Sequence, residues 1–185
     1  MIAHATRAPL PYEPDVFLVV DPVDFVDSDS LVEAQEVLAG GGDVVLIQDP
    51  SNVSAASLAF VQHFVPDPGL VDLGGLPMVP NIGSWCDHLT EVAVDLPLRG
   101  KSLTYPSAPA LRCPGHALIS GTSGVDACDL ICEYESGNGH FLLVLTGAWF
   151  HQSALGTFHV EPVDDQWLHF DMQMELVDLL VSRNR

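Results

Sequence analysis

Lysine and arginine are scarce in this chain of 185 residues, which has only 6 of them against 25 aspartates and glutamates. The cations occur at residue 7, between residues 99 and 112, and at 183–185. Residues 8–98 therefore carry 15 acids, and residues 113–182 carry 10 acids, without a single lysine or arginine in either stretch. Direct binding of nucleic acid needs clustered cations that contact phosphates, so the composition argues against it.

Long apolar runs are also missing, since none reaches the roughly 20 residues of a membrane-spanning helix. The N-terminal MIAHATRAPLPYEPD has no apolar stretch of the kind found in secretory signals. We therefore expect a cytoplasmic protein that does not associate with membranes. Glycine-rich phosphate loops, dinucleotide fingerprints and nucleophile elbows are absent from the sequence as well, so we expect no cofactor.

Apolar residues make up 48% of the chain and charged residues 17%, a balance typical of a protein with a packed core. The length fits one acidic domain over 1–185, with residues 1–14 as an irregular arm. Strand and helix patterns alternate in the first half. β-Branched and aromatic runs predict buried strands at 15–20 and 43–48, and amphipathic segments with serine caps predict helices at 28–42 and 50–66.

The segment 84–95 is compatible with a helix or a strand, and a serine cap favours a short helix. Residues 97–115 contain four prolines and predict an irregular connection. β-Rich runs with turn residues between them predict strands at 116–121, 127–136, 140–150 and 157–163. Residues 164–172 are a further strand candidate, and a helix is expected at 173–183. The expected fold class is α+β, with an N-terminal β-α-β-α layer followed by an antiparallel β-meander and a C-terminal helix.

Ligand-type side chains gather in one window that contains Cys113, His116, Cys128 and Cys132. The spacing superficially resembles a zinc module. From Cys128 onward, however, apolar residues alternate with acids, which predicts a strand whose two cysteines point inward. Residues four apart on a strand are about 13 Å apart, too far to share an ion with bonds of about 2.3 Å. We interpret both as buried free thiols, and Cys113 with His116 as a weak metal candidate.

Two other groups of residues carry catalytic types of side chain. If 84–95 is helical, Cys86 lies near a helix N-terminus that lowers a thiol pKa, with His88 close by and a second histidine required from elsewhere. The histidines of the second half could meet on one face of a sheet and bind a metal. They are His140, His151, His159 and His169. These groups support an alternative hypothesis, a small zinc-, iron- or cysteine-dependent enzyme.

The net charge of −19 is the basis of the preferred hypothesis. Selection for solubility also explains such a charge. An acidic surface additionally attracts basic partners and speeds association with them. We therefore interpret the chain as a non-catalytic acidic binding protein that docks on a basic protein surface, including that of a nucleic-acid-binding protein. Inhibitors, immunity-type factors, chaperones and accessory factors are proteins of this kind. The acids expected to contact the partner are Asp21, Asp24, Asp27, Asp29, Glu33 and Glu36.

Overall fold

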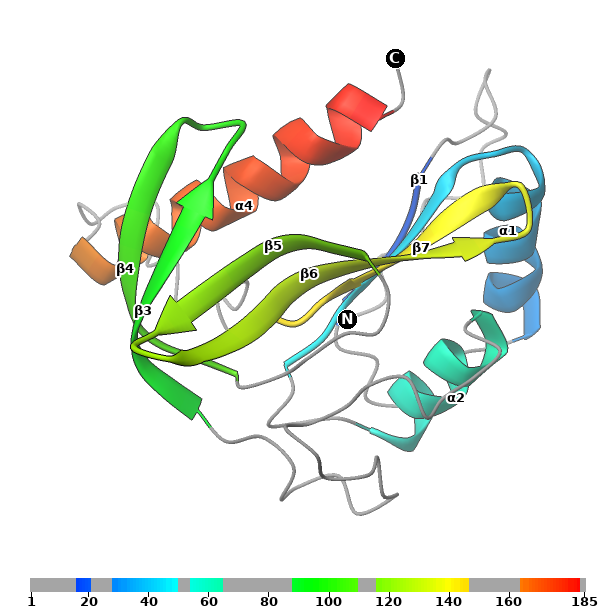
Figure 1. Ribbon diagram of the computed structural model, residues 1–185. Coiled ribbons are helices and arrows are strands. Elements are labelled where there is room, and N and C mark those ends of the chain that lie inside the picture. Colours follow the sequence, from blue (N-terminus) through cyan, green and yellow to red (C-terminus); the bar gives the residue numbers. More distant parts are fainter. Residues whose placement is uncertain are drawn as a thin grey trace, which may run out of the picture.

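The computed structural model describes residues 16–20, 28–49, 54–64, 88–109, 116–146 and 164–183. These residues form one seven-stranded mixed sheet, with helices on both of its faces (Figure 1). The order of strands across the sheet is β1-β2-β7-β6-β5-β3-β4. The expectation of one domain over 1–185 includes residues outside these ranges and stays a prediction. Among the helices that the structure describes, none is long and apolar enough to span a membrane.

The parallel part of the sheet contains strands from both halves of the chain. β1 (Val16–Val20) pairs with β2 (Asp43–Ile47), and β2 pairs with β7 (Gly139–Val144). Helix α1 (Ser28–Ala39) connects the first two strands, and α2 (Ala55–Phe64) follows β2. β2 is buried along its whole length, as its continuous apolar sequence predicts for a strand covered on both faces. The structure confirms strands within 15–20 and 43–48 and helices within 28–42 and 50–66.

The antiparallel part follows in the second half of the chain. It consists of β3 (His88–Leu96), β4 (Lys101–Pro109), β5 (His116–Ser123) and β6 (Asp126–Ser136), and β6 pairs with β7. β5, β6 and β7 follow one another as antiparallel neighbours, as the predicted meander requires, and its fourth predicted strand, 157–163, lies outside the described residues. β3, which was not predicted as part of the meander, lies between β4 and β5. β3 pairs with β5 only at Ala93–Val94, and the β3–β4 hairpin extends away from β5 and β6 (Figure 1).

Three sequence predictions were wrong in this half. The preference for a helix in 84–95 fails because Val92, Val94 and Leu96 alternate with exposed residues and fill the core as a strand. Residues 101–109 of the predicted irregular connection form β4, whose prolines are tolerated because the strand is at the sheet edge. The strand candidate at 164–172 is instead the first half of helix α4 (Asp164–Arg183). The helix predicted at 173–183 was therefore too short, because α4 begins at Asp164.

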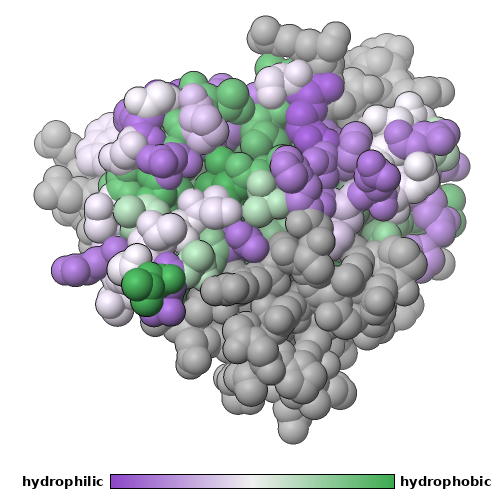
Figure 2. Space-filling view, in the orientation of Figure 1, coloured by the Kyte–Doolittle hydropathy of each residue, from purple (hydrophilic) through white to green (hydrophobic). Residues whose placement is uncertain are grey.

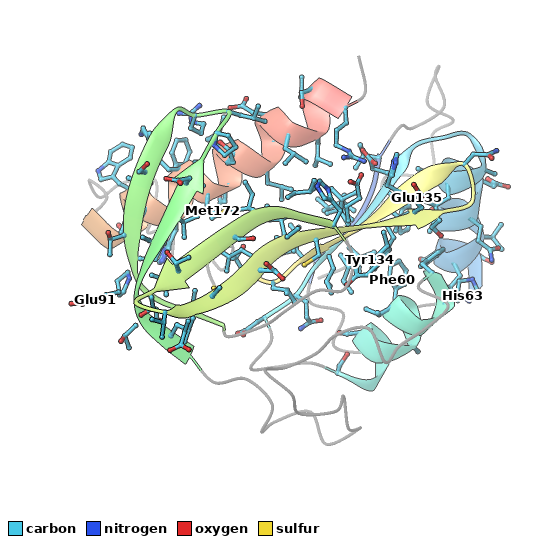
Figure 3. All side chains as sticks on the ribbon, viewed as in Figure 1. Phe60, His63, Glu91, Tyr134, Glu135 and Met172 are labelled. Atoms are coloured by element: carbon cyan, nitrogen blue, oxygen red, sulfur yellow. The ribbon has the colours of Figure 1, made fainter. Side chains whose placement is uncertain are left out.

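Two clusters of apolar side chains hold the helices to the sheet. On one face, the ring of Phe64 in α2 lies 4.9 Å from Phe60 and 5.8 Å from Phe141 of β7. Phe60 and Tyr134 of β6 lie on this same side of the sheet (Figure 3). On the other face, Met172 and other apolar residues of α4 pack against the sheet. The sheet is therefore the middle layer between α1 and α2 on one side and α4 on the other.

A close backbone contact joins the loop before β2 to the turn before β7. The predicted hairpin is present, with Gly137 and Asn138 as its turn residues, and Gly139 begins β7. A Cβ atom on Gly139 would lie 2.1 Å from the carbonyl oxygen of Gly42. The N–H of His140 donates to that same oxygen at 3.2 Å. Only glycine fits at position 139 without moving one of the two backbones.

Candidate functional site

Three of the predicted partner-binding acids lie together on the outer face of α1. Asp29, Glu33 and Glu36 are spaced by four and three residues, which places them on one side of the helix. All three are exposed, and Val32 is half exposed beside them. Figure 2 shows hydrophilic side chains over this part of the molecule. We call Asp29, Glu33 and Glu36 the α1 acidic face; Asp21, Asp24 and Asp27 lie outside the described residues.

The cations of the described ranges face carboxylates of the same chain. Lys101 lies at the start of β4, with its Nζ 2.7 and 2.8 Å from the two carboxylate oxygens of Asp171 in α4. Arg99 lies in the preceding turn, with its Nη1 3.4 Å from Asp178 Oδ2. In the described part of the chain, no cation forms an ion pair with the α1 acidic face. Among the described residues, no positive charge therefore compensates the negative potential of that face.

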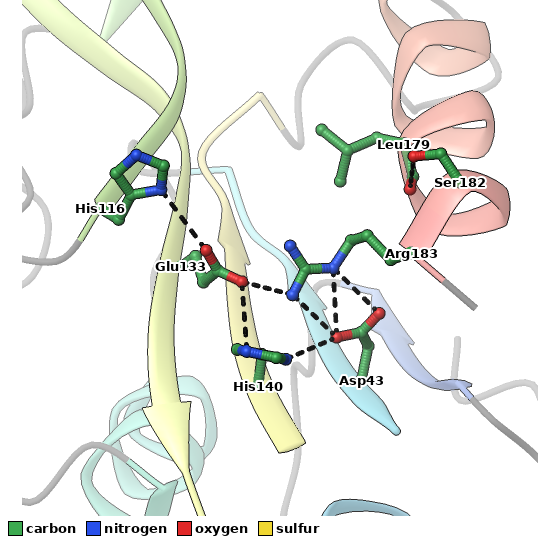
Figure 4. Close-up of polar contacts among 7 residues, drawn as sticks. All are labelled: Asp43, His116, Glu133, His140, Leu179, Ser182 and Arg183. Carbon is green, nitrogen blue, oxygen red and sulfur yellow. Dashed lines mark hydrogen bonds and ion pairs between the residues drawn. The ribbon is translucent and has the colours of Figure 1, made fainter. Parts of the chain in front are cut away.

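The third described cation, Arg183, belongs to a polar network at the amino ends of β2 and β7 (Figure 4). Its Nε lies 3.2 Å from Asp43 Oδ2, and its Nη2 also contacts Glu133 Oε1. His140 lies between the carboxylates, with Nδ1 3.5 Å from Asp43 Oδ1 and Nε2 3.7 Å from Glu133 Oε1. Together with Gly41, these four residues line a surface pocket of about 260 Å³.

Burial and neighbouring charges shift the pKa values of Glu133 and Arg183 in opposite directions. Burial alone would raise the pKa of Glu133, but the hydrogen bond and charge of Arg183 together with the two nearby histidines, His140 and His116, lower it below its usual value. Burial alone would lower the pKa of Arg183, but hydrogen bonds and charges from Asp43 and Glu133 raise it. Both side chains therefore stay charged in the folded protein near neutral pH.

The geometry of the network fits a structural clasp better than a catalytic centre. Both ring nitrogens of His140 face carboxylates, and Arg183 is engaged by Asp43 and Glu133. A general base would need a ring nitrogen that faces a substrate instead. Because Arg183 ends α4, the contacts hold that helix end against the sheet. Among the residues that the structure describes, no group of three or more His, Cys, Asp or Glu could hold a metal ion.

Two of the predicted metal candidates, His116 and His140, both contact Glu133 in the described structure. His116 begins β5 and contacts Glu133, with its Nδ1 3.4 Å from Glu133 Oε2, while His140 joins the clasp. His88 is the first residue of strand β3, so the helical setting expected for it and Cys86 is wrong at that residue. Cys86, Cys113 and His151 lie outside the described residues. Sequence reasoning missed Asp43 and Arg183, although an acid at the start of an apolar strand and an arginine at the end of a predicted helix were visible signals.

The two cysteines of β6 differ from one another. Cys128 is a buried free thiol, as predicted. Burial, and to a smaller extent the charge of Asp129, raises its pKa to about 11, although a weak hydrogen bond to the Gly121 carbonyl acts to lower it. Such a thiol is a poor nucleophile at neutral pH. Cys132 is also buried but is disulfide-bonded, so its interpretation as a free thiol was wrong. The alternation of the strand predicted its burial correctly but contains no information about pairing.

Comparisons with known proteins identify no family. No protein-family model matches the chain, and no curated protein matches it. Among solved structures, the chain is similar to Gan42B, a GH42 β-galactosidase from G. stearothermophilus. The sequence identity is 15% and the TM-score is 0.41, and the match covers 90% of this chain and 21% of Gan42B. It is also similar to the exo-β-1,4-mannosidase Op5Man5 from Opitutaceae bacterium strain TAV5, with 16% identity, a TM-score of 0.44, and coverage of 91% and 25%. The chain thus spans a quarter or less of the length of these enzymes.

Proposed function

We propose that this chain is a non-catalytic acidic binding protein that docks on a basic protein partner through the α1 acidic face. The observation that carries the proposal is the distribution of ion pairs. Arg99, Lys101 and Arg183 are paired with carboxylates on the sheet or on α4, whereas the α1 acidic face has no cation paired with it in the described part of the chain. The basic partner supplies the missing positive charge.

The α1 acidic face also has the mixed character of a docking surface. Val32 is half exposed at the edge of this face and offers an apolar contact beside the three acids. Buried contacts at the middle of an interface contribute most of its affinity, whereas charges at the rim mainly speed association. The helix itself is held from behind by Ala34, Val37 and Leu38, which pack into the core. A rigid helix loses little freedom on binding.

A capture experiment tests this proposal. The native chain is immobilised and exposed to lysate of its host, and retained proteins are released by raising the salt. The triple variant Asp29→Asn, Glu33→Gln, Glu36→Gln should lose a basic partner that the native chain retains. The matched control, Glu91→Gln, Asp95→Asn, Asp126→Asn, should retain it. It removes three exposed charges from β3 and from the start of β6, which lie at the opposite end of the molecule from α1 (Figure 1). Equal retention by both variants would contradict the proposal.

We also propose that the protein is located in the cytoplasm, and the redox state of Cys132 tests this location. Disulfides persist in oxidising compartments and are rare in the cytosol. The disulfide of Cys132 conflicts with the expected location unless the bond is absent in the cell. Thiols should therefore be blocked at the moment of lysis, and Cys132 should be examined by mass spectrometry. Cys132 found blocked supports the cytoplasmic location, and Cys132 found in a disulfide contradicts it.

A further inference from the structure

The outward face of α4 carries a row of apolar side chains. Trp167 and Phe170 are 50% and 43% exposed, and Val177 and Val181 are each 47% exposed. Met174, which is partly buried, lies between the two pairs. These five positions follow one another at intervals of three, four, three and four residues, which is the spacing of a coiled-coil seam. We call these five residues the α4 stripe.

The α4 stripe is not used to pack the helix on its own sheet. The opposite side of α4 does that through Met172, Leu176 and Leu179, which are all buried. α4 is therefore apolar on two faces, and a helix of this kind is usually covered on both. A contiguous exposed apolar row of this kind marks an interaction surface.

The charges beside the α4 stripe identify what covers it. Gln166 and Gln173 border one side and are uncharged. On the other side, Asp171 and Asp178 are paired with Lys101 and Arg99 of the same chain. Among the described side chains, the two acids that border the stripe are therefore balanced by cations, in a chain whose net charge is −19. Two copies of so acidic a protein repel each other over most of their surface, and a neutral apolar surface is where they can touch.

We propose that the α4 stripe is a homodimer interface in which two copies of α4 pack antiparallel across a two-fold axis at Met174. The large side chains, Trp167 and Phe170, occupy the first half of the stripe, and the small ones, Val177 and Val181, occupy the second half. Antiparallel packing sets large against small along the whole seam and keeps the two helices evenly spaced. Parallel packing would set tryptophan against tryptophan and valine against valine, leaving a gap at one end.

The size of the surface sets the strength of the dimer. A helix of 20 residues is about 30 Å long and about 10 Å wide, so its footprint on a partner is about 300 Å². A standard stable interface buries about 800 Å² on each partner. We therefore expect a weak dimer, with a dissociation constant in the micromolar range or above, that forms and dissociates with protein concentration.

Sedimentation velocity over a range from about 1 µM to about 1 mM tests the interface. The native chain should shift from monomer to dimer across the range. Met174→Glu places two like charges together at the axis and should abolish the shift. Val32→Glu introduces the same charge at an exposed valine on α1, away from the stripe, and should leave the shift unchanged. A native chain that stays monomeric throughout, or a Met174→Glu chain that dimerises as well as the native one, would overturn the proposal.

Salt dependence separates this interface from the docking of a basic partner. Added salt screens the repulsion between two acidic copies, so the dimer should become tighter as the salt concentration rises. Association through the α1 acidic face should weaken under the same change. Dimerisation that weakens with salt would show that it is held by charge pairs, which contradicts an interface formed by the α4 stripe.

Cysteine cross-linking tests the antiparallel arrangement. Chains with Trp167→Cys are mixed with chains carrying Val181→Cys and oxidised mildly, with the unsubstituted chain as the baseline for its own cysteines. The mixture should form a covalent dimer that contains one chain of each kind, and Trp167→Cys alone should form none beyond the baseline. A covalent dimer of two Trp167→Cys chains would show parallel packing and overturn the arrangement.

Discussion

Removing the positive charge of Arg183 should weaken the fold more than any other single change to the clasp. Arg183→Met keeps the length of the side chain and its apolar stem but leaves Asp43 and Glu133 facing each other's charge. The Asp43 side chain is only 3% exposed and Glu133 is 16% exposed, so water can compensate little. Breaking a buried ion pair by removing one partner typically costs about 3–5 kcal/mol.

The expected loss is smaller than that range for two reasons. Arg183 is itself 20% exposed, and His140 still faces both carboxylates after the substitution. We expect the free energy of unfolding to fall by about 2–3 kcal/mol at neutral pH. Removing the Asp43 charge as well, in Arg183→Met with Asp43→Asn, should cost less than the sum of the two single changes, because both substitutions remove the same ion pair.

Urea unfolding followed by the fluorescence of the chain's tryptophans measures this loss. With a slope of about 2 kcal/mol per molar urea, the midpoint should fall by about 1–1.5 M. Ser182→Ala, an exposed neighbour on α4, is the control and should shift the midpoint little. An Arg183→Met midpoint equal to that of the control would refute the clasp.

The same comparison has a defined pH dependence. The pKa of Glu133 is lowered in the folded chain, so its contribution to stability is complete above the ordinary glutamate value of 4.5. That contribution is lost as the pH falls through the lowered pKa, because the proton removes the charge that Arg183 pairs with. The stability difference between native and Arg183→Met chains should therefore narrow as the pH drops below 4.5. A difference that stays constant into acid would contradict the assignment.

Two further predictions follow from the described contacts. Gly139→Ala places a Cβ against the Gly42 carbonyl and should lower the free energy of unfolding, measured in urea, by about 1–3 kcal/mol. In the control Gly40→Ala, the new Cβ meets its nearest atoms at 3.5 Å and should be tolerated. Equal stabilities of the two variants would disprove the close approach at Gly139. In the purified, folded protein, alkylation without reductant should leave Cys128 unmodified because it is buried with a raised pKa, and unfolding alone should expose it. Cys132 should require both unfolding and a reductant, and its alkylation after unfolding alone would argue against the disulfide.

The elements with one clear periodicity were predictable from the sequence. The apolar run of β2 and the amphipathic pattern of α1 were each placed within a few residues of their observed bounds. The segment that became β3 was misinterpreted because a serine cap suggested a helix, although its apolar residues alternate with period two. β4 was missed because prolines usually exclude a strand, and its place at the sheet edge depends on long-range pairing that local sequence does not contain.

The candidate site was predictable only where it depends on spacing along a helix. The α1 acidic face follows directly from acids four and three residues apart. The clasp joins side chains 140 residues apart in the chain, Asp43 and Arg183, and no local pattern indicates that they meet. The length of α4 was underestimated because its outward face is as apolar as its buried one, which obscures the helical period in the region of Trp167.

The most direct test of the central claim is the association rate with the captured partner, measured by stopped flow over salt concentrations from about 0.01 to about 1 M. For the native chain and for the control lacking the charges of Glu91, Asp95 and Asp126, the rate should fall steeply as salt rises. For the variant lacking the charges of Asp29, Glu33 and Glu36, it should start lower and fall less. A rate that does not depend on salt, or that is the same for all three chains, would contradict docking through the α1 acidic face.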